Sequence, residues 1–395
     1  MDKYNFDEII PRKGTNCLKY DLAEVGDRAA LWIADMDFKT PDFIVDAMRR
    51  RLEHPVFGYS FIPESYFNAV TSWVKDLHGW EISKEWVRYI PGIVKGIGMV
   101  LCRFCNPGDK VIIMPPVYHP FRIVPEKNGL EVVKCPLIPI YDEEGFLKTY
   151  KMDFDALESV IDEKTRVLIL SNPHNPCGVC WPVEELKKLA HICAEHNVLV
   201  ISDEIHAEMA FNGHKHHPFA TVSEEAANNS ISFLAPSKTF NIAGIVSSYT
   251  VVPNDSLRDI FFRYLDANEY DSPTIMSVIA AEAAYTYGHE WRKQMLDYVQ
   301  GNIDYVDEYL RKFIPQLHCV KPDASFLVWL DCRKLGVTQE ELVCLFRDKA
   351  GLFLNDGSMF GEQGNGFMRL NVGCPRSVLT SALESLACAV SGMNK

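Results

Sequence analysis

Residues 166–203 read RVLILSNPHNPCGVCWPVEELKKLAHICAEHNVLVISD and contain the pattern of a strand, a loop, a helix and a second strand. The apolar runs 166–171 and 199–202 have the length of buried strands. Residues 183–196 have the amphipathic spacing of a helix, and Pro182 is a favourable residue for its start. A strand that is followed by a helix and another strand is the unit of a parallel sheet. This stretch therefore predicts an α/β fold.

The same alternation of short apolar runs with longer amphipathic stretches continues on both sides of this unit. Because successive strands are joined through helices, we expect a mainly parallel sheet that is covered by helices on both faces. The additional strands are expected at residues 110–114, 130–135, 230–234 and 247–252.

The last third of the chain predicts a second and smaller α/β unit. Residues 273–315 are expected to form one long helix, or two helices that are separated near Gly288. Beyond this stretch, strands are expected at residues 326–330 and 367–371, and helices at residues 339–349 and 377–390.

This organisation predicts three segments. Residues 1–45 are an N-terminal segment that contributes to the small domain, and residues 46–275 form the large domain. Residues 276–395 form a linker helix and the C-terminal small domain. A chain of 395 residues is long for a single core, which agrees with two domains.

The composition is that of an ordinary globular protein, with 47% hydrophobic and 24% charged residues. The net charge of −13 is spread along the chain and disfavours nucleic acid, whose binding needs lysine and arginine side chains that neutralise phosphates. Residues 1–14 lack the apolar run of a signal peptide, and no apolar stretch has the length of a membrane span. We therefore expect a cytoplasmic protein without a membrane partner, whose 12 cysteines are mostly reduced.

Two groups of side chains have the residue types of a metal site, but a structural explanation is favoured for both. Cys102 and Cys105 form one C-x-x-C pair, and Cys177 and Cys180 form another. The first pair ends an apolar helical stretch, where cysteine packs as a small hydrophobic residue, and the second lies in a loop with proline and glycine. The run HKHH at residues 214–217 is expected to be a polar surface turn. No metal site is predicted.

Polar side chains follow three of the expected strands. In parallel α/β sheets, ligands bind at the carboxyl ends of the strands, so these side chains are expected to meet at one edge. Each signal also has an ordinary explanation, because Asp203 is a suitable helix cap and Lys238 by itself resembles an exposed lysine. The segments concerned are NPHNPCG at 172–178, DEIH at 203–206 and APSKTFN at 235–241, together with PGIVKG at 91–96, which opens a helix.

In combination, these motifs resemble the class I/II aminotransferase-like enzymes of fold type I, which use pyridoxal 5′-phosphate (PLP). The resemblance covers nearly the whole chain, as far as FMRLN at residues 367–371. Within this family, WIADMD at residues 32–37 and the Asp-Glu-Ile-His motif resemble the MalY/PatB-type cystathionine β-lyases. The resemblance implies the aspartate-aminotransferase-like fold, with a mainly parallel sheet in the large domain and a smaller α/β domain.

PLP chemistry needs the groups that these motifs contain. A lysine binds the cofactor as a Schiff base and moves a proton at the substrate Cα, and a carboxylate keeps the pyridine nitrogen protonated. The resemblance implies that Lys238 and Asp203 have these two catalytic roles. It also implies that Tyr118, which could otherwise be a core aromatic residue, stacks on the cofactor ring. Asn175 and His206 are implied to face the phenolic oxygen.

The resemblance also implies how the phosphate is bound. Many relatives place an arginine for the phosphate eight residues after the lysine, whereas this chain has Val246 there. Phosphate binding must then depend more on the other contacts, which the resemblance places at the backbone of Val94 and Lys95, the hydroxyl of Ser237, and Tyr59 of the other subunit. A contact from the other subunit implies a homodimer with shared active sites.

For the substrate, the resemblance implies Arg369 and Asn175. A guanidinium group presents two N–H donors to a carboxylate, a geometry that lysine cannot imitate. Arg369 is therefore implied to bind the α-carboxylate of an amino acid.

The function implied by the resemblance is a carbon–sulfur β-lyase that cleaves cystathionine or a related S-substituted cysteine to a thiol, pyruvate and ammonia. An aminotransferase is the alternative, because it uses the same residues up to the removal of the Cα proton. A non-catalytic binding protein on this fold is a third possibility, but it would tolerate the loss of Lys238 or Arg369, and both are present.

Overall fold

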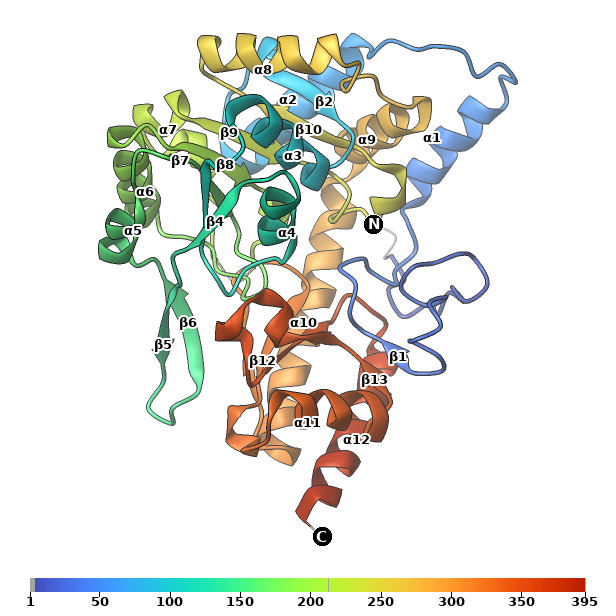
Figure 1. Cartoon of the computed structure of the whole chain (residues 1–395). Helices are drawn as coiled ribbons and strands as arrows, with labels where there is room; N and C mark the ends of the chain where they lie inside the picture. The colour runs from blue at the N-terminus through green and yellow to red at the C-terminus, as the bar shows by residue number, and fades with distance from the viewer. Residues whose placement is uncertain (1–3, 212, 395) are drawn as a thin grey trace.

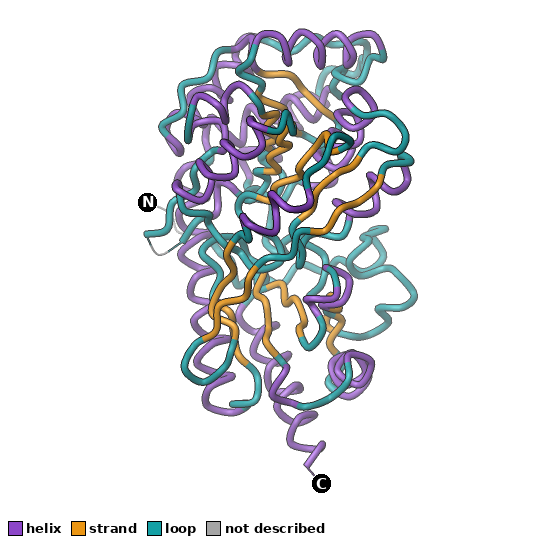
Figure 2. The backbone as a smooth tube through the Cα atoms, turned by 60° about the vertical axis from the view of Figure 1, so that its left-hand side comes forward, coloured by secondary structure: helices purple, strands orange, loops and turns teal. Residues whose placement is uncertain are grey.

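The computed structural model describes residues 4–211 and 213–394. Its strands gather in two places, one in the upper part of the molecule and one in the lower part, with helices around both (Figures 1 and 2). The upper sheet has seven strands in the order β2 (Val87–Ile90), β10 (Ser248–Val251), β9 (Ser230–Leu234), β8 (Leu199–Asp203), β7 (Thr165–Ser171), β3 (Lys110–Ile113) and β4 (Glu131–Lys134).

The large sheet is parallel over five neighbouring strands. β9, β8, β7, β3 and β4 pair in parallel, whereas β10 is antiparallel to both β9 and β2. The prediction of a mainly parallel sheet is therefore confirmed.

Helices cover both faces of this sheet, and the side chains of β7 show why. Val167 and Ile169 pack in a core cluster with α3 (Ile93–Phe104) and α8 (Asp255–Ala267). Leu168 and Leu170 point to the opposite face, where they pack in a cluster with α6 (Val183–Glu195). Successive side chains of a strand point to opposite faces, so a continuous apolar run gives a strand that is buried on both sides.

A second sheet of four strands forms the smaller unit. Its order is β11 (His318–Val320), β12 (Leu327–Asp331), β15 (Phe367–Asn371) and β14 (Asn355–Asp356), with all pairs antiparallel. Two short pairs complete the strands, β1 (Ala29–Ala30) with β13 (Leu352–Phe353) and β5 (Ile138–Tyr141) with β6 (Leu147–Lys151). The β1–β13 pair joins the N-terminal segment to the C-terminal part of the chain.

The longest helix connects the two units. α9 (Ile275–Tyr287) and α10 (His289–Phe313) meet at Gly288, so the interrupted form of the predicted helix is the correct one. α10 runs from the upper to the lower part of the molecule in Figure 1. Its buried residues recur with helical spacing and place one face along the core. They are Trp291, Met295, Val299, Asn302, Ile303, Val306, Asp307 and Leu310.

The remaining helices surround these sheets. Among the described residues, no helix is both long enough and apolar enough to cross a membrane. The boundaries of the three predicted segments stay a prediction. The other helices are α1 (Asp42–Leu52), α2 (Glu64–His78), α4 (Pro120–Lys127), α5 (Phe154–Val160), α7 (Glu224–Asn228), α11 (Gln339–Cys344) and α12 (Arg376–Ser391).

Candidate active site

The carboxyl ends of β7, β8 and β9 bring three sequence motifs together. The strands are adjacent and parallel, and Ser171, Asp203 and Phe233 stand opposite one another in register. The loops that follow therefore leave the sheet at the same edge, as expected for a ligand site. Gly178, which closes the loop after β7, has a φ of +70°, and a Cβ there would lie 2.3 Å from Pro322 Cβ, so only glycine fits.

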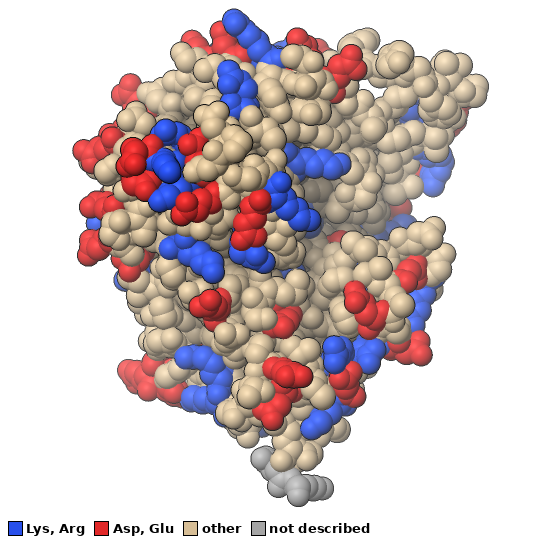
Figure 3. Space-filling view, in the orientation of Figure 1, with Lys and Arg blue, Asp and Glu red and all other residues tan. Residues whose placement is uncertain are grey.

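A cavity of about 290 Å³ lies at this edge. The molecule is also visibly hollowed between its upper and lower parts (Figure 3). Ser171, Ser247 and Ser248 line the cavity as well, and the sequence motifs had not indicated these three hydroxyls. Eight of the predicted residues line it, namely Val94, Lys95, Tyr118, Asn175, Asp203, His206, Ser237 and Lys238.

Lys238 and Asp203 are buried in the same cavity, and each is perturbed by its environment. Burial lowers the pKa of the Lys238 ammonium to about 8, against a smaller opposing effect of Asp35 and Asp203. Burial raises the pKa of the Asp203 carboxyl to about 7, although the Ile205 backbone N–H donates to it at 3.1 Å. A buried carboxyl of this kind is stabilised in its charged form when a cation binds beside it.

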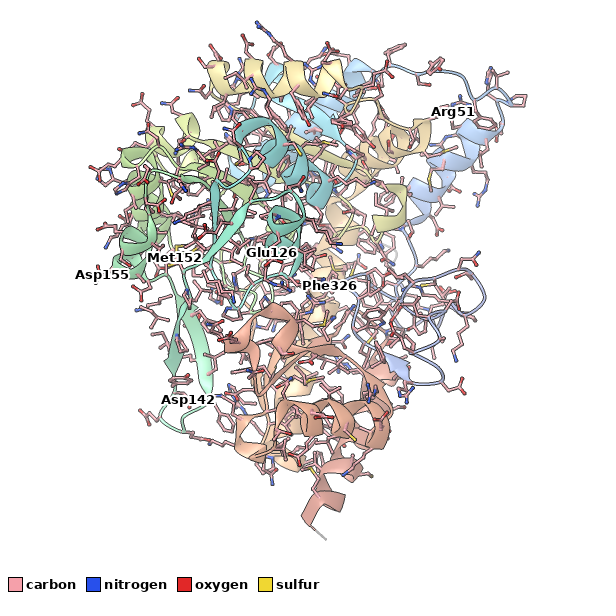
Figure 4. All side chains as sticks on the ribbon, viewed as in Figure 1. Arg51, Glu126, Asp142, Met152, Asp155 and Phe326 are labelled. Atoms are coloured by element: carbon pink, nitrogen blue, oxygen red, sulfur yellow. The ribbon has the colours of Figure 1, made fainter. Side chains whose placement is uncertain are left out.

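Two further groups are buried around these residues. Burial lowers the pKa of His206 to about 3, so its imidazole is neutral at neutral pH. Its Nδ1 atom has no hydrogen-bond partner among the described residues. Tyr118 is held next to the loop after β7, because its backbone N–H donates to the Asn175 carbonyl at 3.1 Å. The ring of Phe326, a residue of the smaller unit that is labelled in Figure 4, has its centroid 6.3 Å from that of the His206 ring.

Arg369 reaches the site from the smaller unit. It lies on β15 and is only 3% exposed, and its Nη1 donates to Asn175 Oδ1 at 3.0 Å. Its Nη2 donates to the Trp32 carbonyl at 3.0 Å and to Asn355 Oδ1 at 2.5 Å. Asn355 was not among the residues singled out from the sequence. The structure thus places a buried guanidinium group next to the predicted amide of Asn175.

The N-terminus of α3 faces the same cavity. Gly92, Ile93, Val94 and Lys95 all line it, and Gly92 caps the helix with a φ of +105° and without a side-chain hydrogen bond. The first backbone N–H groups of a helix lack partners within the helix and attract anions. This helix start therefore suits a phosphate group.

Residues 32–38 cross between the two units and contact both of the predicted functional cations. The Trp32 carbonyl accepts from Arg369, and the Ala34 carbonyl accepts from Lys238 Nζ at 2.5 Å. Two asparagine side chains hold the rest of the segment. Asn371 Nδ2 donates to the carbonyls of Ile33 and Asp35, and Asn241 Nδ2 donates to those of Met36 and Phe38.

One prediction about polar side chains is wrong. The prediction of a polar surface turn at residues 214–217 is wrong for His216, which is 2% exposed because its Nε2 lies 2.8 Å from the buried Glu204 carboxylate. Among the described residues, no group of three or more histidine, cysteine or acidic side chains has the arrangement of a metal site.

Tyr59 is fully exposed and does not line the cavity of its own chain.

The chain is similar to known proteins over nearly its whole length. A model of the family described as aminotransferase class I and II matches residues 31–386. Cystathionine beta-lyase PatB of Bacillus subtilis is 38% identical over 392 residues, which cover 98% of this chain and 100% of that protein. Protein MalY of Escherichia coli is 30% identical over 394 residues, which cover 98% of this chain and 99% of that protein.

Solved structures show the same similarity. Cystalysin from Treponema denticola, which contains a pyridoxal 5′-phosphate cofactor, has a TM-score of 0.93 and 31% identity, with 99% of each chain covered. A PLP-bound C–S lyase from Staphylococcus hominis has a TM-score of 0.89 and 32% identity, with 98% of this chain and 98% of that chain covered. The chain therefore belongs to the aminotransferase class I and II family.

Proposed function

We propose that this protein is a PLP-dependent C–S β-lyase that cleaves cystathionine or a related S-substituted cysteine. The observation that carries the proposal is the pairing of a buried lysine with a buried carboxyl in one cavity, with a buried arginine beside it. Its full-length relative PatB is named a cystathionine beta-lyase, and solved neighbours are PLP-bound C–S lyases, which favours the lyase over the aminotransferase.

The residues of the cavity fit PLP. Asp203 suits a protonated pyridine nitrogen, since its burial makes a cationic partner favourable. The start of α3 and the hydroxyl of Ser237 suit a phosphate, and the flat ring of Tyr118 suits a stacked aromatic cofactor. The unpartnered Nδ1 of His206 is available for a hydrogen bond to a bound group.

In this cavity, PLP supplies a ring that accepts the electrons released when the substrate Cα loses its proton. Arg369 binds the substrate α-carboxylate and thereby fixes the position of Cα. The Lys238 amine removes the Cα proton, and its lowered pKa makes the neutral amine accessible near neutral pH. Asp203 holds the proton on the ring nitrogen. The bond between Cβ and sulfur would then break, and the leaving sulfur would take up a proton to give the thiol. The remaining three-carbon enamine would react with one water molecule to give pyruvate and ammonia.

The lyase is distinguished from an aminotransferase because it needs no second substrate, whereas the aminotransferase needs a keto acid. Purified holoenzyme mixed with cystathionine alone is expected to release pyruvate and a free thiol. Both products are measured, the thiol with a thiol reagent and pyruvate with lactate dehydrogenase. Product formation that starts only after a keto acid is added would assign the aminotransferase reaction instead.

We also propose a homodimer in which Tyr59 contacts the phosphate bound by the other subunit. Tyr59 lies in an exposed segment whose apolar side chains include Val56, Phe57 and Phe61, exposed by 61%, 58% and 84%. A contiguous apolar segment of this kind marks an interaction surface. The exposed hydroxyl of Tyr59 is then available to a neighbouring subunit.

A mixed dimer tests whether Tyr59 acts across the interface. Subunits with Tyr59→Phe are combined with subunits with Lys238→Ala, after Tyr59→Phe alone has been found to weaken PLP binding. If Tyr59 acts in trans, the heterodimer has one intact site, and half of its sites should bind PLP with wild-type affinity and turn over at the wild-type rate. If Tyr59 acts in cis, every site with a lysine also lacks the hydroxyl, and wild-type affinity is absent.

A further inference from the structure

We propose that Asn355 is a positioning residue that orients Arg369 for the substrate α-carboxylate while leaving the guanidinium charge unneutralised. This inference rests on the proposed function, in which Arg369 binds that carboxylate.

The sheet pairing places the two side chains next to each other. Asn355 on β14 stands opposite Arg369 on β15 in the antiparallel register, and opposite residues of paired strands have side chains on the same face. Asn355 is 5% exposed, and its Oδ1 accepts from Arg369 Nη2 at 2.5 Å. Its Nδ2 lies 3.8 Å from Met359 Sδ, which directs the amide nitrogen away from the guanidinium group and the oxygen toward it.

All the hydrogen-bond acceptors that the described residues offer to Arg369 are neutral. They are the side-chain oxygens of Asn175 and Asn355 and the carbonyl of Trp32. The guanidinium group also lies over the Phe360 ring, 4.9 Å from its centroid. Burial lowers the pKa of Arg369 to about 10, so the group stays charged at neutral pH without a carboxylate partner. A buried cation in this state favours an incoming carboxylate.

The proposed role of Asn355 therefore requires that its side chain is uncharged. Aspartate has nearly the same shape, but its carboxylate would pair with the guanidinium group and compete with the substrate. The same pair would compensate a buried charge and thereby support the fold. Substrate binding and thermal stability should consequently respond in different directions to Asn355→Asp, whereas damage to packing would reduce both.

Two small probes separate the carboxylate from the rest of the amino acid. L-Alanine has no leaving group, and isopropylamine replaces its carboxylate with a methyl group. The dissociation constant of each is measured from the visible spectrum of the PLP-loaded holoenzyme. For L-alanine, we expect the dissociation constant to rise about 10-fold in Asn355→Ala, because a charge-assisted contact that orients Arg369 is lost. In Asn355→Asp we expect a rise of at least about 100-fold, because the new carboxylate also competes with that of the substrate. For isopropylamine, we expect less than a twofold change in either variant.

The cystathionine reaction and the melting temperature give independent readouts. KM should rise in both variants with kcat changed less than about threefold, since the lost interaction is made equally in the ground state and the transition state. The melting temperature of Asn355→Asp should be no lower than that of Asn355→Ala. Asn302→Ala is the matched control, because Asn302 is also buried, and among the described residues its side chain bonds the carbonyls of Val372 and Cys374 and the Arg376 side chain. It should lower the melting temperature and leave the L-alanine dissociation constant unchanged.

Each outcome supports or contradicts a separate statement. If wild-type protein binds L-alanine, and both Asn355 variants bind it equally well, the role of Asn355 is refuted. Equal weakening of L-alanine and isopropylamine also refutes it, because the effect is then not specific to the carboxylate. If the wild-type dissociation constant of L-alanine is unaffected by Arg369→Ala, the proposed substrate contact itself is wrong. Should Asn355→Asp fail to load PLP, Asn355→Ala decides by the same criteria.

Discussion

Replacing Lys238 with alanine is expected to reduce turnover of cystathionine by at least about 10,000-fold, which corresponds to about 5.4 kcal/mol of transition-state stabilisation. The reason is that the same amine binds the cofactor and removes the Cα proton, and no other lysine side chain is buried beside Asp203 in the described part of the cavity. The variant should still bind PLP, since the phosphate and ring contacts remain. Steady-state kinetics and equilibrium dialysis measure the two quantities.

Chemical labelling provides the control for this prediction. Wild-type holoenzyme should be yellow, and borohydride should abolish the visible band while fixing the cofactor to Lys238 Nζ. Peptide mapping by mass spectrometry then identifies the labelled lysine. A label on another lysine, or full activity in Lys238→Ala, would contradict the assignment of Lys238.

Replacing Asp203 with asparagine is expected to lower kcat/KM by at least about 100-fold, or about 2.7 kcal/mol. Asparagine keeps the size of the side chain and can still accept from the Ile205 N–H. It removes the charge that keeps the pyridine nitrogen protonated, so the ring accepts electrons less well. The loss should appear in kcat, and the visible spectrum of the holoenzyme should change with it.

Glu208→Gln is the matched control for Asp203→Asn. Glu208 is a second buried carboxyl, 3% exposed, which accepts from Trp73 Nε1 at 2.8 Å and does not line the cavity. Its replacement should leave kcat/KM within about threefold of the wild-type value. Near-normal activity in Asp203→Asn would reduce Asp203 to a structural role, in which its side chain accepts from the Ile205 N–H at the end of β8.

The part of the site that could be predicted from the sequence consists of side chains that follow the ends of strands. Asn175, Asp203 and Lys238 follow apolar runs that are recognisable from sequence, and parallel strands bring their carboxyl ends to one edge. The order of these motifs along the chain therefore contains most of the information about their arrangement in space.

Other features depend on contacts that leave no local pattern. β14 has only two residues, too few for a recognisable periodicity, and the position of Asn355 beside Arg369 follows from the register of β14 with β15. His216 resembles a surface residue because it stands among polar neighbours, and its burial results from the return of its loop to Glu204. Pairings between distant segments of this kind are determined by the assembled core.

Residues 32–38 have a thermodynamic consequence for the proposed function. Their carbonyls already accept hydrogen bonds from Lys238 and Arg369, so the protein's own backbone acts as a resident ligand for both cations. Arrival of the substrate carboxylate at Arg369 is an exchange reaction in which one hydrogen-bonded partner replaces another. The gross strength of such a bond, about 4–6 kcal/mol, largely cancels between the two states, and about 0.5–3 kcal/mol per contact remains as net affinity. Release of the carboxylate product is then assisted, because the Trp32 carbonyl competes for the same Arg369 donor.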